Sequence, residues 1–261
     1  MELALEGRTA LVTGASKGIG LAITRALAAE GARVVAGSLT GSAELDELAT
    51  RADVRSVSVD LTTPDGPARL VEAATEDGAG LDVLVNNVGA VRPRLDGFLA
   101  VSDDDWEWTL TINFLAAVRT MRAAIPHLTG REGANIVTIS SVNAFLPDPG
   151  VIDYSAAKGA LTNLCKSLSK ELGPEIRVNT ISPGPVRTDL WLGDQGVAAT
   201  VAEGSDVSPD DVVRRQEAAA PSGRFTRPEE IADLVRFLCS TRAANITGSD
   251  FVIDGGLVTT L

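Results

Sequence analysis

The strongest constraint on the fold is an alternation between short runs rich in β-branched residues and longer amphipathic stretches. It continues along the whole chain, and each pair has the length of one strand–helix unit. Such alternation is typical of a parallel sheet whose connections are helices. The strand candidates are residues 9–14, 32–37, 54–60, 81–87, 134–141, 176–184 and 250–256. The sequence therefore predicts an α/β fold, with a doubly wound, seven-stranded parallel sheet and helices on both faces.

Nothing in the sequence marks a boundary inside this pattern. The chain has 261 residues, of which 44% are hydrophobic, enough for one sizeable core. No internal repeat or low-complexity linker interrupts it, and its helices end at ordinary signals such as Gly31, or Gly173 followed by Pro174. We expect a single domain over residues 1–261.

Composition excludes several classes of protein. The formal net charge of -12 makes binding to nucleic acid or to an anionic membrane surface unfavourable. Cys165 and Cys239 have no paired spacing, and His127 is the only histidine, so we expect two buried thiols and no metal site. The start of the chain does not resemble a signal peptide, and no apolar run reaches about 18 residues. These features predict a cytoplasmic protein without a membrane span.

Polar and glycine-rich segments follow the predicted strands. In a doubly wound parallel sheet, the ligand crevice lies beyond the carboxyl ends of the strands, near the point where the strand order reverses. A purely structural fold would place turn residues at both strand ends without bias. The clustering therefore favours a ligand site, formed by residues 14–20, Asp60, residues 86–89, Ser140, Ser141 and residues 183–188.

The first of these segments, TGASKGIG, has glycines at positions 14, 18 and 20 and opens directly into a predicted helix. Glycines let the backbone approach a pyrophosphate, and a helix start supplies unpaired N–H groups and a partial positive charge. The spacing differs from the dinucleotide fingerprint G-x-G-x-x-G, and a tight strand-to-helix turn is the structural alternative. Asp60 suits a hydrogen bond to an adenine amino group, although a cap on the following turn explains it nearly as well.

The end of the second predicted strand decides the type of dinucleotide. An acidic residue there binds a ribose 2'-hydroxyl, whereas a basic residue accepts a 2'-phosphate. Residues 37–40 are Gly-Ser-Leu-Thr, without an acid. Lys17 can neutralise a 2'-phosphate and Ser38 can donate a hydrogen bond to it. NADP(H) is therefore favoured, and NAD(H) stays open because an arginine is missing.

Tyr154 and Lys158 form a Y-x-x-x-K pair at the start of a predicted helix, on one helical face. A nearby ammonium, together with a positively charged nicotinamide ring, lowers the pKa of a phenol from about 10 toward neutrality, where it can act as general acid or base. A half-buried tyrosine beside an extended lysine is the structural alternative.

Two further polar positions belong to the same predicted crevice. Ser140 and Ser141 end the strand before this helix, and a hydroxyl there can bind a substrate oxygen as negative charge develops. Asn113 lies in a predicted helix among apolar residues, so its side chain should be buried and needs partners. It is either a structural residue or a polar kink that feeds a water chain to Lys158.

In this order the motifs resemble those of the short-chain dehydrogenase/reductases, over nearly the whole chain. The resemblance implies an NAD(P)-binding Rossmann fold and an oxidoreductase that acts on CH–OH groups, with a small carbonyl or alcohol as substrate. Val88 replaces the alanine of the family's NNAG motif, a small change that we expect to be tolerated. The matching set is TGASKGIG, NNVG at residues 86–89, Asn113, Ser141 thirteen residues before Tyr154, Lys158, and PGPVRTD at residues 183–189.

The resemblance also implies a role for each motif residue. Tyr154 would be the catalytic acid or base, and Lys158 would lower its pKa and bind the nicotinamide ribose. Ser141 would polarise the carbonyl and Asn113 would hold a proton-relay water. The residues expected at the substrate are Ser141, Asn143 and Tyr154. Those expected at the cofactor are Gly14, Ser16, Lys17, Gly18, Ile19, Gly20, Ser38, Asp60, Leu61, Asn87, Gly89, Tyr154, Lys158, Pro183, Gly184, Val186 and Thr188.

The substrate is left open by these motifs. The resemblance places a substrate lid at residues 189–222 and implies a homotetramer or homodimer. Arg92 and Arg94, near the expected mouth, would suit the anionic or carrier-linked end of a hydrophobic ketone, unless they are ordinary solvated charges. The favoured function is an NADP(H)-dependent reductase of ketoacyl, polyketide or similar carbonyls, as in 3-oxoacyl-[acyl-carrier-protein] reductase-like members. The alternatives are an NAD-dependent secondary alcohol dehydrogenase and a non-catalytic nucleotide-sensing protein, which the intact Ser-Tyr-Lys set disfavours.

Overall fold

The computed structural model describes residues 2–76, 78, 80–205 and 207–260. Its centre is a seven-stranded sheet with the order β3-β2-β1-β4-β5-β6-β7, in which all neighbours are parallel. All seven predicted strands are confirmed, most of them slightly shorter than expected because their terminal polar and glycine residues leave the ladder to form loops. The strands are β1 (Thr9–Thr13), β2 (Arg33–Ser38), β3 (Val54–Ser58), β4 (Val83–Asn86), β5 (Asn135–Ile139), β6 (Arg177–Pro183) and β7 (Asp250–Ile253).

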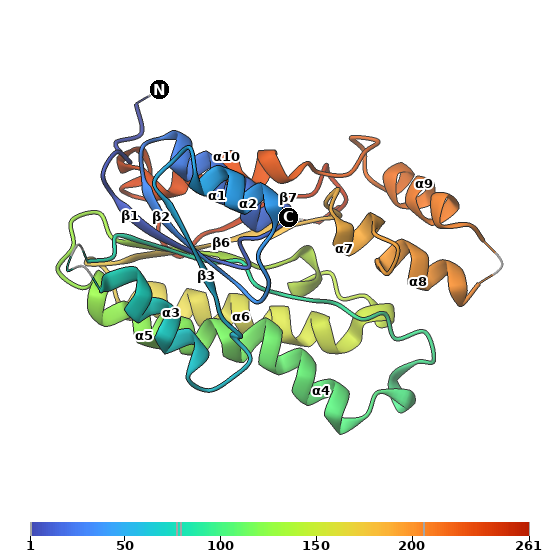
Figure 1. The fold of residues 1–261 in the computed structure, drawn as a ribbon. Helices are drawn as coiled ribbons and strands as arrows, with labels where there is room; N and C mark the ends of the chain where they lie inside the picture. Colours follow the sequence, from blue (N-terminus) through green and yellow to red (C-terminus); the bar gives the residue numbers. More distant parts are fainter. Residues whose placement is uncertain (1, 77, 79, 206, 261) are drawn as a thin grey trace.

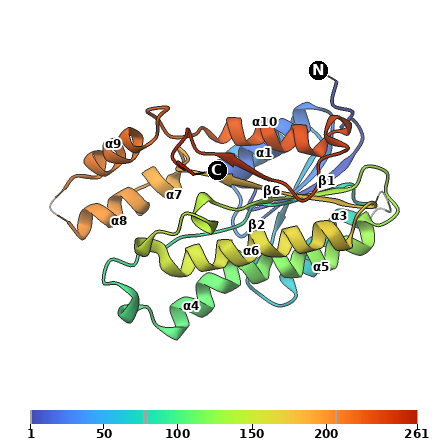
Figure 2. The same ribbon diagram turned by 180° about the vertical axis from the view of Figure 1, so that it is seen from behind.

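Helices cover both faces of the sheet (Figure 1). One face carries α1 (Gly18–Ala29), α2 (Ala43–Ala49) and α10 (Pro228–Cys239). The other carries α3 (Gly66–Thr75), α5 (Ala116–Leu128) and α6 (Ile152–Glu171). α4 (Asp103–Leu110) continues into α5 through a π-helical turn, Thr111–Leu115. Figure 2 shows three short helices projecting beyond the sheet after β6, namely α7 (Asp189–Leu192), α8 (Val197–Glu203) and α9 (Pro209–Ala219).

The strands are apolar on both sides because both faces of the sheet are buried. Successive side chains of a strand point to opposite faces. In β1, Ala10 and Val12 join the core under α1 and α10, whereas Leu11 joins the core under α3, α5 and α6. Leu11 pairs in register with Val35 of β2 and Leu84 of β4, so an apolar row crosses the sheet.

The strand order reverses between β1 and β4. β2 and β3 extend the sheet to one side of this pair, and β5, β6 and β7 extend it to the other. Loops that leave the two central strands therefore diverge and open a crevice at their carboxyl ends. This geometry brings residues 14–20 next to residues 86–89, which are far apart in sequence.

The two cysteines are buried and free, as expected. Burial raises the pKa of Cys165 to about 11 and that of Cys239 to about 12, so neither thiol is activated. Across the described ranges, no group of three or more His, Cys, Asp or Glu side chains is placed to hold a metal ion. No helix in the same ranges combines the length and apolar character that crossing a membrane requires.

We expect Leu27→Ala to lower the free energy of unfolding by about 2–5 kcal/mol, because Leu27 is fully buried in the core under α1 and α10 and the change leaves a cavity. Denaturant titration measures this change. Leu39→Ala is the matched control, since Leu39 is 66% exposed and its loss should stay within about 0.5 kcal/mol. Equal effects of the two substitutions would contradict the described core.

Candidate active site

The loop after β1 is shaped by its glycines. Gly14 and Gly18 have φ angles of 65° and 54°, in the left-handed region that favours glycine. At Gly20 the reason is space, because a Cβ atom would overlap the carbonyl oxygen of Gly14. The Lys17 side chain makes no capping hydrogen bond at the start of α1. The first turn of α1 is thus left without a side-chain cap, an arrangement that suits a phosphate group.

Asn87 ties this loop to the end of β4. Its side-chain amide donates to the carbonyl oxygens of Thr13 (2.9 Å) and Gly14 (3.2 Å), and its backbone N–H donates to the Thr13 hydroxyl at 2.9 Å. The backbone N–H of Val88 donates to the same hydroxyl at 3.1 Å. The Asn-Asn-Val-Gly motif therefore fixes the two sides of the crevice to each other.

A cavity of about 580 Å³ opens beside the glycine loop, at the carboxyl ends of the central strands. The substrate residues expected from the sequence, Ser141, Asn143 and Tyr154, all border it, and so does Lys158. Most of the remaining wall is apolar. Of the expected cofactor residues, the following line the cavity: Ile19, Asn87, Gly89, Tyr154, Lys158, Pro183, Gly184, Val186 and Thr188.

The other expected cofactor residues lie outside this cavity, along the same edge of the sheet. Gly14 and Gly18 adjoin it, since Cβ atoms there would lie 3.0 Å from Asn87 and 3.2 Å from Thr188, and Ser16 and Lys17 stand between them in the same loop. Ser38 ends β2 with a buried hydroxyl that has no hydrogen-bond partner among the residues described. Leu61, after β3, is buried.

Asp60 caps the turn that follows β3, which was one of the two interpretations of this residue. Its Oδ1 accepts hydrogen bonds from the backbone N–H of Thr62 at 2.8 Å and from the Thr62 hydroxyl at 2.7 Å. These bonds hold the pKa of Asp60 below its usual range. The turn therefore explains Asp60 without a ligand, and contact with an adenine stays a prediction.

Tyr154 stands in the first turns of α6, at the cavity wall, with the Lys158 ammonium 5.6 Å from its ring centre. The lowering of the phenol pKa by the ammonium together with a bound nicotinamide stays a prediction. Burial raises the pKa of Tyr154 to about 12, and a hydrogen bond with Ser141 opposes that shift only in part. Lys158 is itself buried, which lowers its pKa to about 8, and its ammonium donates to the carbonyl oxygen of Ile139 at 2.9 Å. Desolvation is therefore the largest cause of both shifts.

Asn113 lies in the π-helical turn between α4 and α5 and is 1% exposed. Its Oδ1 accepts from the backbone N–H of Ala90 at 3.0 Å, and its Nδ2 donates to the carbonyl oxygens of Ala90 (2.8 Å) and Thr109 (3.1 Å). A Cβ atom at Gly89 would lie 2.9 Å from Asn113 Oδ1 and 3.5 Å from Lys158 Nζ. The prediction that Asn113 is buried with partners is confirmed. Its Oδ1 and the Nζ atom of Lys158 both lie beside Gly89.

Both interpretations of Arg94 were wrong. Arg94 is neither a solvated charge nor free for an anion, because its side chain is 11% exposed and forms ion pairs with Asp105 (2.8 Å) and Asp153 (2.5 Å). Arg92 is exposed, with its guanidinium stacked 3.6 Å from the centre of the Trp108 ring. The aspartates that occupy Arg94 come from other elements, so its own sequence neighbourhood could not reveal them.

Part of the cavity wall comes from residues that the motifs did not single out. Trp191 follows β6 in segment 189–222 and packs edge to face on Phe225, with ring centres 5.3 Å apart. Apolar residues after an active-site strand are the only sequence signal for such a wall. From this segment the cavity is lined by Leu190, Trp191, Val197, Gln216 and Ala219, and from elsewhere by Val91, Leu146, Pro147, Asp148, Pro149, Val151 and Leu257.

Known proteins match this chain over nearly its whole length. A family model described as Enoyl-(Acyl carrier protein) reductase matches residues 14–258. The 3-oxoacyl-[acyl-carrier-protein] reductase FabG of Aquifex aeolicus is 35% identical, with 98% of this chain and 100% of the relative covered. Dehydrogenase/reductase SDR family member 4 of Homo sapiens is 34% identical, with 97% and 88% covered. A structure of L-sorbose reductase from Gluconobacter frateurii, complexed with NADPH and L-sorbose, has a TM-score of 0.91 at 33% identity, with both chains covered to 100%.

The doubly wound sheet, with its glycine loop at the point of strand reversal, defines a protein of the Rossmann class. The comparisons narrow this class, and the chain belongs to the short-chain dehydrogenase/reductase family. It is an oxidoreductase of that family, which confirms the expected family, fold class and type of enzyme.

We expect the pKa of Tyr154 to exceed the unperturbed value of about 10 in the folded protein without added nucleotide. The folded chain then keeps a proton that the unfolded chain has lost. The stability from this proton is complete below about pH 10 and is lost as the pH rises through about 12. Because Tyr154 is the only tyrosine, a tyrosinate absorbance titration reports on it alone. Native ionisation at or below the pH seen in urea would contradict the prediction.

Proposed function

We propose that the protein is an NADP(H)-dependent carbonyl reductase, which transfers a hydride between the nicotinamide and a ketone or secondary alcohol. The observation that carries the proposal is the convergence of Ser141, Tyr154 and Lys158 on one cavity, next to the glycine loop. These residues come from the end of β5 and from α6, and only the parallel sheet brings them to the same edge. An intact proton donor, hydroxyl and ammonium set favours catalysis over nucleotide sensing alone.

The residues present fit a dinucleotide. A Cβ at Gly20 would overlap the carbonyl oxygen of Gly14, so this glycine lets the start of α1 pack closely on the loop, as the third glycine of a dinucleotide-binding loop does. No side chain caps the start of α1 at Lys17, so its first N–H groups can bind a phosphate. The cavity wall formed by residues 183–188 would hold a nicotinamide. When bound, the cofactor supplies or accepts the hydride.

NADP(H) is favoured because no acid stands at the end of β2 to bind a ribose 2'-hydroxyl. Leu39 and Thr40 are exposed there, as is Lys17 across the loop, and an exposed ammonium suits a 2'-phosphate. The sorbose reductase of similar fold was solved with NADPH. Ser38 offers less than expected, since its hydroxyl is buried. NAD(H) stays open as the alternative cofactor, and with it an NAD-dependent secondary alcohol dehydrogenase.

In the proposed reaction, Tyr154 donates the proton and Ser141 stabilises the charge. The Ser141 hydroxyl donates a hydrogen bond to the substrate oxygen as that oxygen becomes negative, and Tyr154 transfers its phenolic proton to it. Lys158 is mostly ammonium at neutral pH, since its pKa is about 8, and its charge favours the phenolate left behind. Asn113 borders the same glycine as Lys158 and would hold the water that returns a proton.

Burial raises the pKa of Tyr154 to about 12, so the phenol is protonated at neutral pH, which is the form that carbonyl reduction uses. The same cavity supports a ketone without an anionic group near the carbonyl. Among the described residues, Lys158 is the only cationic one that lines the cavity. Arg94 is ion-paired with Asp105 and Asp153 and does not face a substrate. Ketoacyl, polyketide or similar ketones fit this apolar wall.

Segment 189–222 would serve as the substrate lid, because α7, α8 and α9 all contribute residues to the cavity. A single domain and a homotetramer, or a homodimer, stay predictions. An assembly is supported by β7, an edge strand on which Val252 is 47% exposed.

Tyr154→Phe should lower kcat about 10²–10⁴-fold, because it removes only the proton donor. The dissociation constant for NADPH, measured by fluorescence titration, should stay unchanged. Turnover is followed by NADPH oxidation with a panel of neutral ketones. Undiminished turnover in the variant would sink the assignment of Tyr154, and no turnover by the native protein with any ketone or alcohol would sink the proposed function.

Lys17→Ala should raise the dissociation constant for NADPH roughly 10-fold, since it removes one charge-assisted contact with a phosphate. Binding of NADH, which has no 2'-phosphate, should not change. Lys170→Ala is the control, because Lys170 is also an exposed lysine and lies near the end of α6. Equal losses for both nucleotides would argue against Lys17 as the group that selects NADP(H).

A further inference from the structure

A connected set of polar contacts lies beside the cavity, and the roles proposed above do not use most of it. Asp153, the residue before Tyr154, has a side chain that is 1% exposed and is ion-paired with Arg94. We propose that the Arg94–Asp153 pair is a positioning device, which holds the backbone of Tyr154 in fixed relation to Asn113. This inference rests on the proposed function, since it assigns the pair to the same active site.

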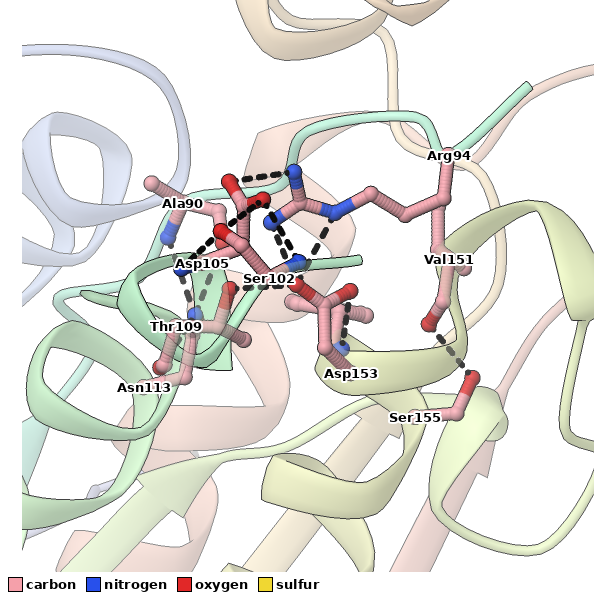
Figure 3. Close-up of polar contacts among 10 residues, drawn as sticks. Ala90, Arg94, Ser102, Asp105, Thr109, Asn113, Val151, Asp153 and Ser155 are labelled. Atoms are coloured by element: carbon pink, nitrogen blue, oxygen red, sulfur yellow. Dashed lines mark hydrogen bonds and ion pairs between the residues drawn. The ribbon is translucent and has the colours of Figure 1, made fainter. Parts of the chain in front are cut away.

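Asp153 uses both carboxylate oxygens. Its Oδ1 accepts the backbone N–H of Tyr154 at 3.0 Å. Its Oδ2 accepts from Arg94 through Nε (3.0 Å) and Nη2 (2.5 Å), and from the hydroxyl of Thr109 at 2.7 Å. Figure 3 shows the Arg94 guanidinium between the carboxylates of Asp153 and Asp105, with Thr109 on the side toward Asn113. One carboxylate thus joins the first turn of α6 to α4 and to the loop after β4.

The remaining guanidinium nitrogen of Arg94 binds the start of α4. Its Nη1 donates to Asp105 at 2.8 Å, and Asp105 closes the capping box with Ser102 at the start of that helix. The backbone N–H of Arg94 donates to the carbonyl oxygen of Gly150, just before α6, at 2.7 Å. Arg94 therefore holds the loop after β4 against both helices.

Thr109 continues the path to the site. While its hydroxyl binds Asp153, its carbonyl oxygen accepts from Asn113 Nδ2 at 3.1 Å. Asn113 in turn holds both backbone polar groups of Ala90, next to Gly89. Three hydrogen bonds thus link the N–H of Tyr154, through the residues Asp153 and Thr109, to Asn113, which lies beside Gly89 as Lys158 does.

An ion pair in this place is better explained by geometry than by stability. Burying two charges carries a desolvation penalty, and an apolar pair of the same shape often stabilises a protein as well or better. An arginine that donates from three nitrogens to two carboxylates fixes direction, which apolar contacts do not. Burial alone would raise the pKa of Asp153, but the hydrogen bonds from Arg94, Thr109 and Tyr154 outweigh it and hold that pKa below its usual range. The carboxylate is therefore charged throughout the neutral range.

The test compares Asp153→Asn with Asp82→Asn. Asp82 is the matched control, because it too is a buried carboxylate. It accepts hydrogen bonds from the backbone N–H of Thr9 (2.9 Å) and from Arg131 Nε (3.0 Å), but it lies at the amino-terminal ends of the strands, away from the cavity. Both changes remove one charge from a buried pair. We expect only Asp153→Asn to lower kcat, roughly 10- to 100-fold, as misplacement of a reacting group does, with NADPH affinity and KM nearly unchanged.

A second readout does not depend on turnover. Protein labelled with carbon-13 at the ring of tyrosine gives the signal of Tyr154 alone. Asp153→Asn should shift this signal and Asp82→Asn should leave it in place. If the native protein reduces no ketone, the proposed function fails, but the labelled signal still decides whether Asp153 positions Tyr154.

Thr109→Val keeps the experiment decisive if Asp153→Asn does not fold. It removes one hydroxyl from the path with little change of shape. Thr120→Val removes a similarly buried hydroxyl of α5, which donates to the carbonyl oxygen of Ala116 and is not part of the path. Thr109→Val should lower kcat and shift the tyrosine signal, whereas Thr120→Val should do neither. An unmoved signal with native kcat in Thr109→Val, or equal effects in either variant and its control, overturns the proposal.

Discussion

The parallel pairing of β1 with β4 is the constraint on which the rest of the structure depends. It reverses the strand order, so that the loops after these two strands diverge and leave room for a ligand. The Thr13 hydroxyl and the Asn87 amide hold the divergent loops together by hydrogen bonds. Every group of the candidate site is placed relative to this junction, including those delivered by β5, α6 and the segment after β6.

Burial sets the chemistry at this junction as much as charge does. The buried surroundings disfavour charge on both side chains. They raise the pKa of Tyr154, which keeps its proton, and lower the pKa of Lys158, which binds its proton less tightly. The same desolvation makes the Arg94–Asp153 pair dependent on geometry, because each partner is costly to bury alone. A reductase benefits from the first effect, since a protonated phenol is the form that donates.

Regular elements and motifs could be read from the sequence, whereas several partners could not. The seven strands followed from β-branched runs, and the burial of Asn113 followed from its apolar neighbours. Arg94 was misread because its aspartates lie 11 and 59 residues away. Burial also raises the pKa of Tyr154, an effect that the sequence could not show, because spacing on a helix shows which charges are near but not how far water is excluded.

The sequence by itself determined the family, the sheet and the identity of the reactive groups, since hydrophobic period and motif order are local properties of the chain. The tertiary structure alone decided which polar atoms are occupied and which are available. Asp60 is bound by its own turn, Arg94 by two aspartates and Asn113 by Ala90, and even Ser141, at the cavity wall, has its hydroxyl hydrogen-bonded to Asn143 Oδ1 at 3.2 Å. The physical reason is that desolvation and hydrogen-bond pairing depend on all atoms around a group, and most of those atoms come from distant parts of the chain.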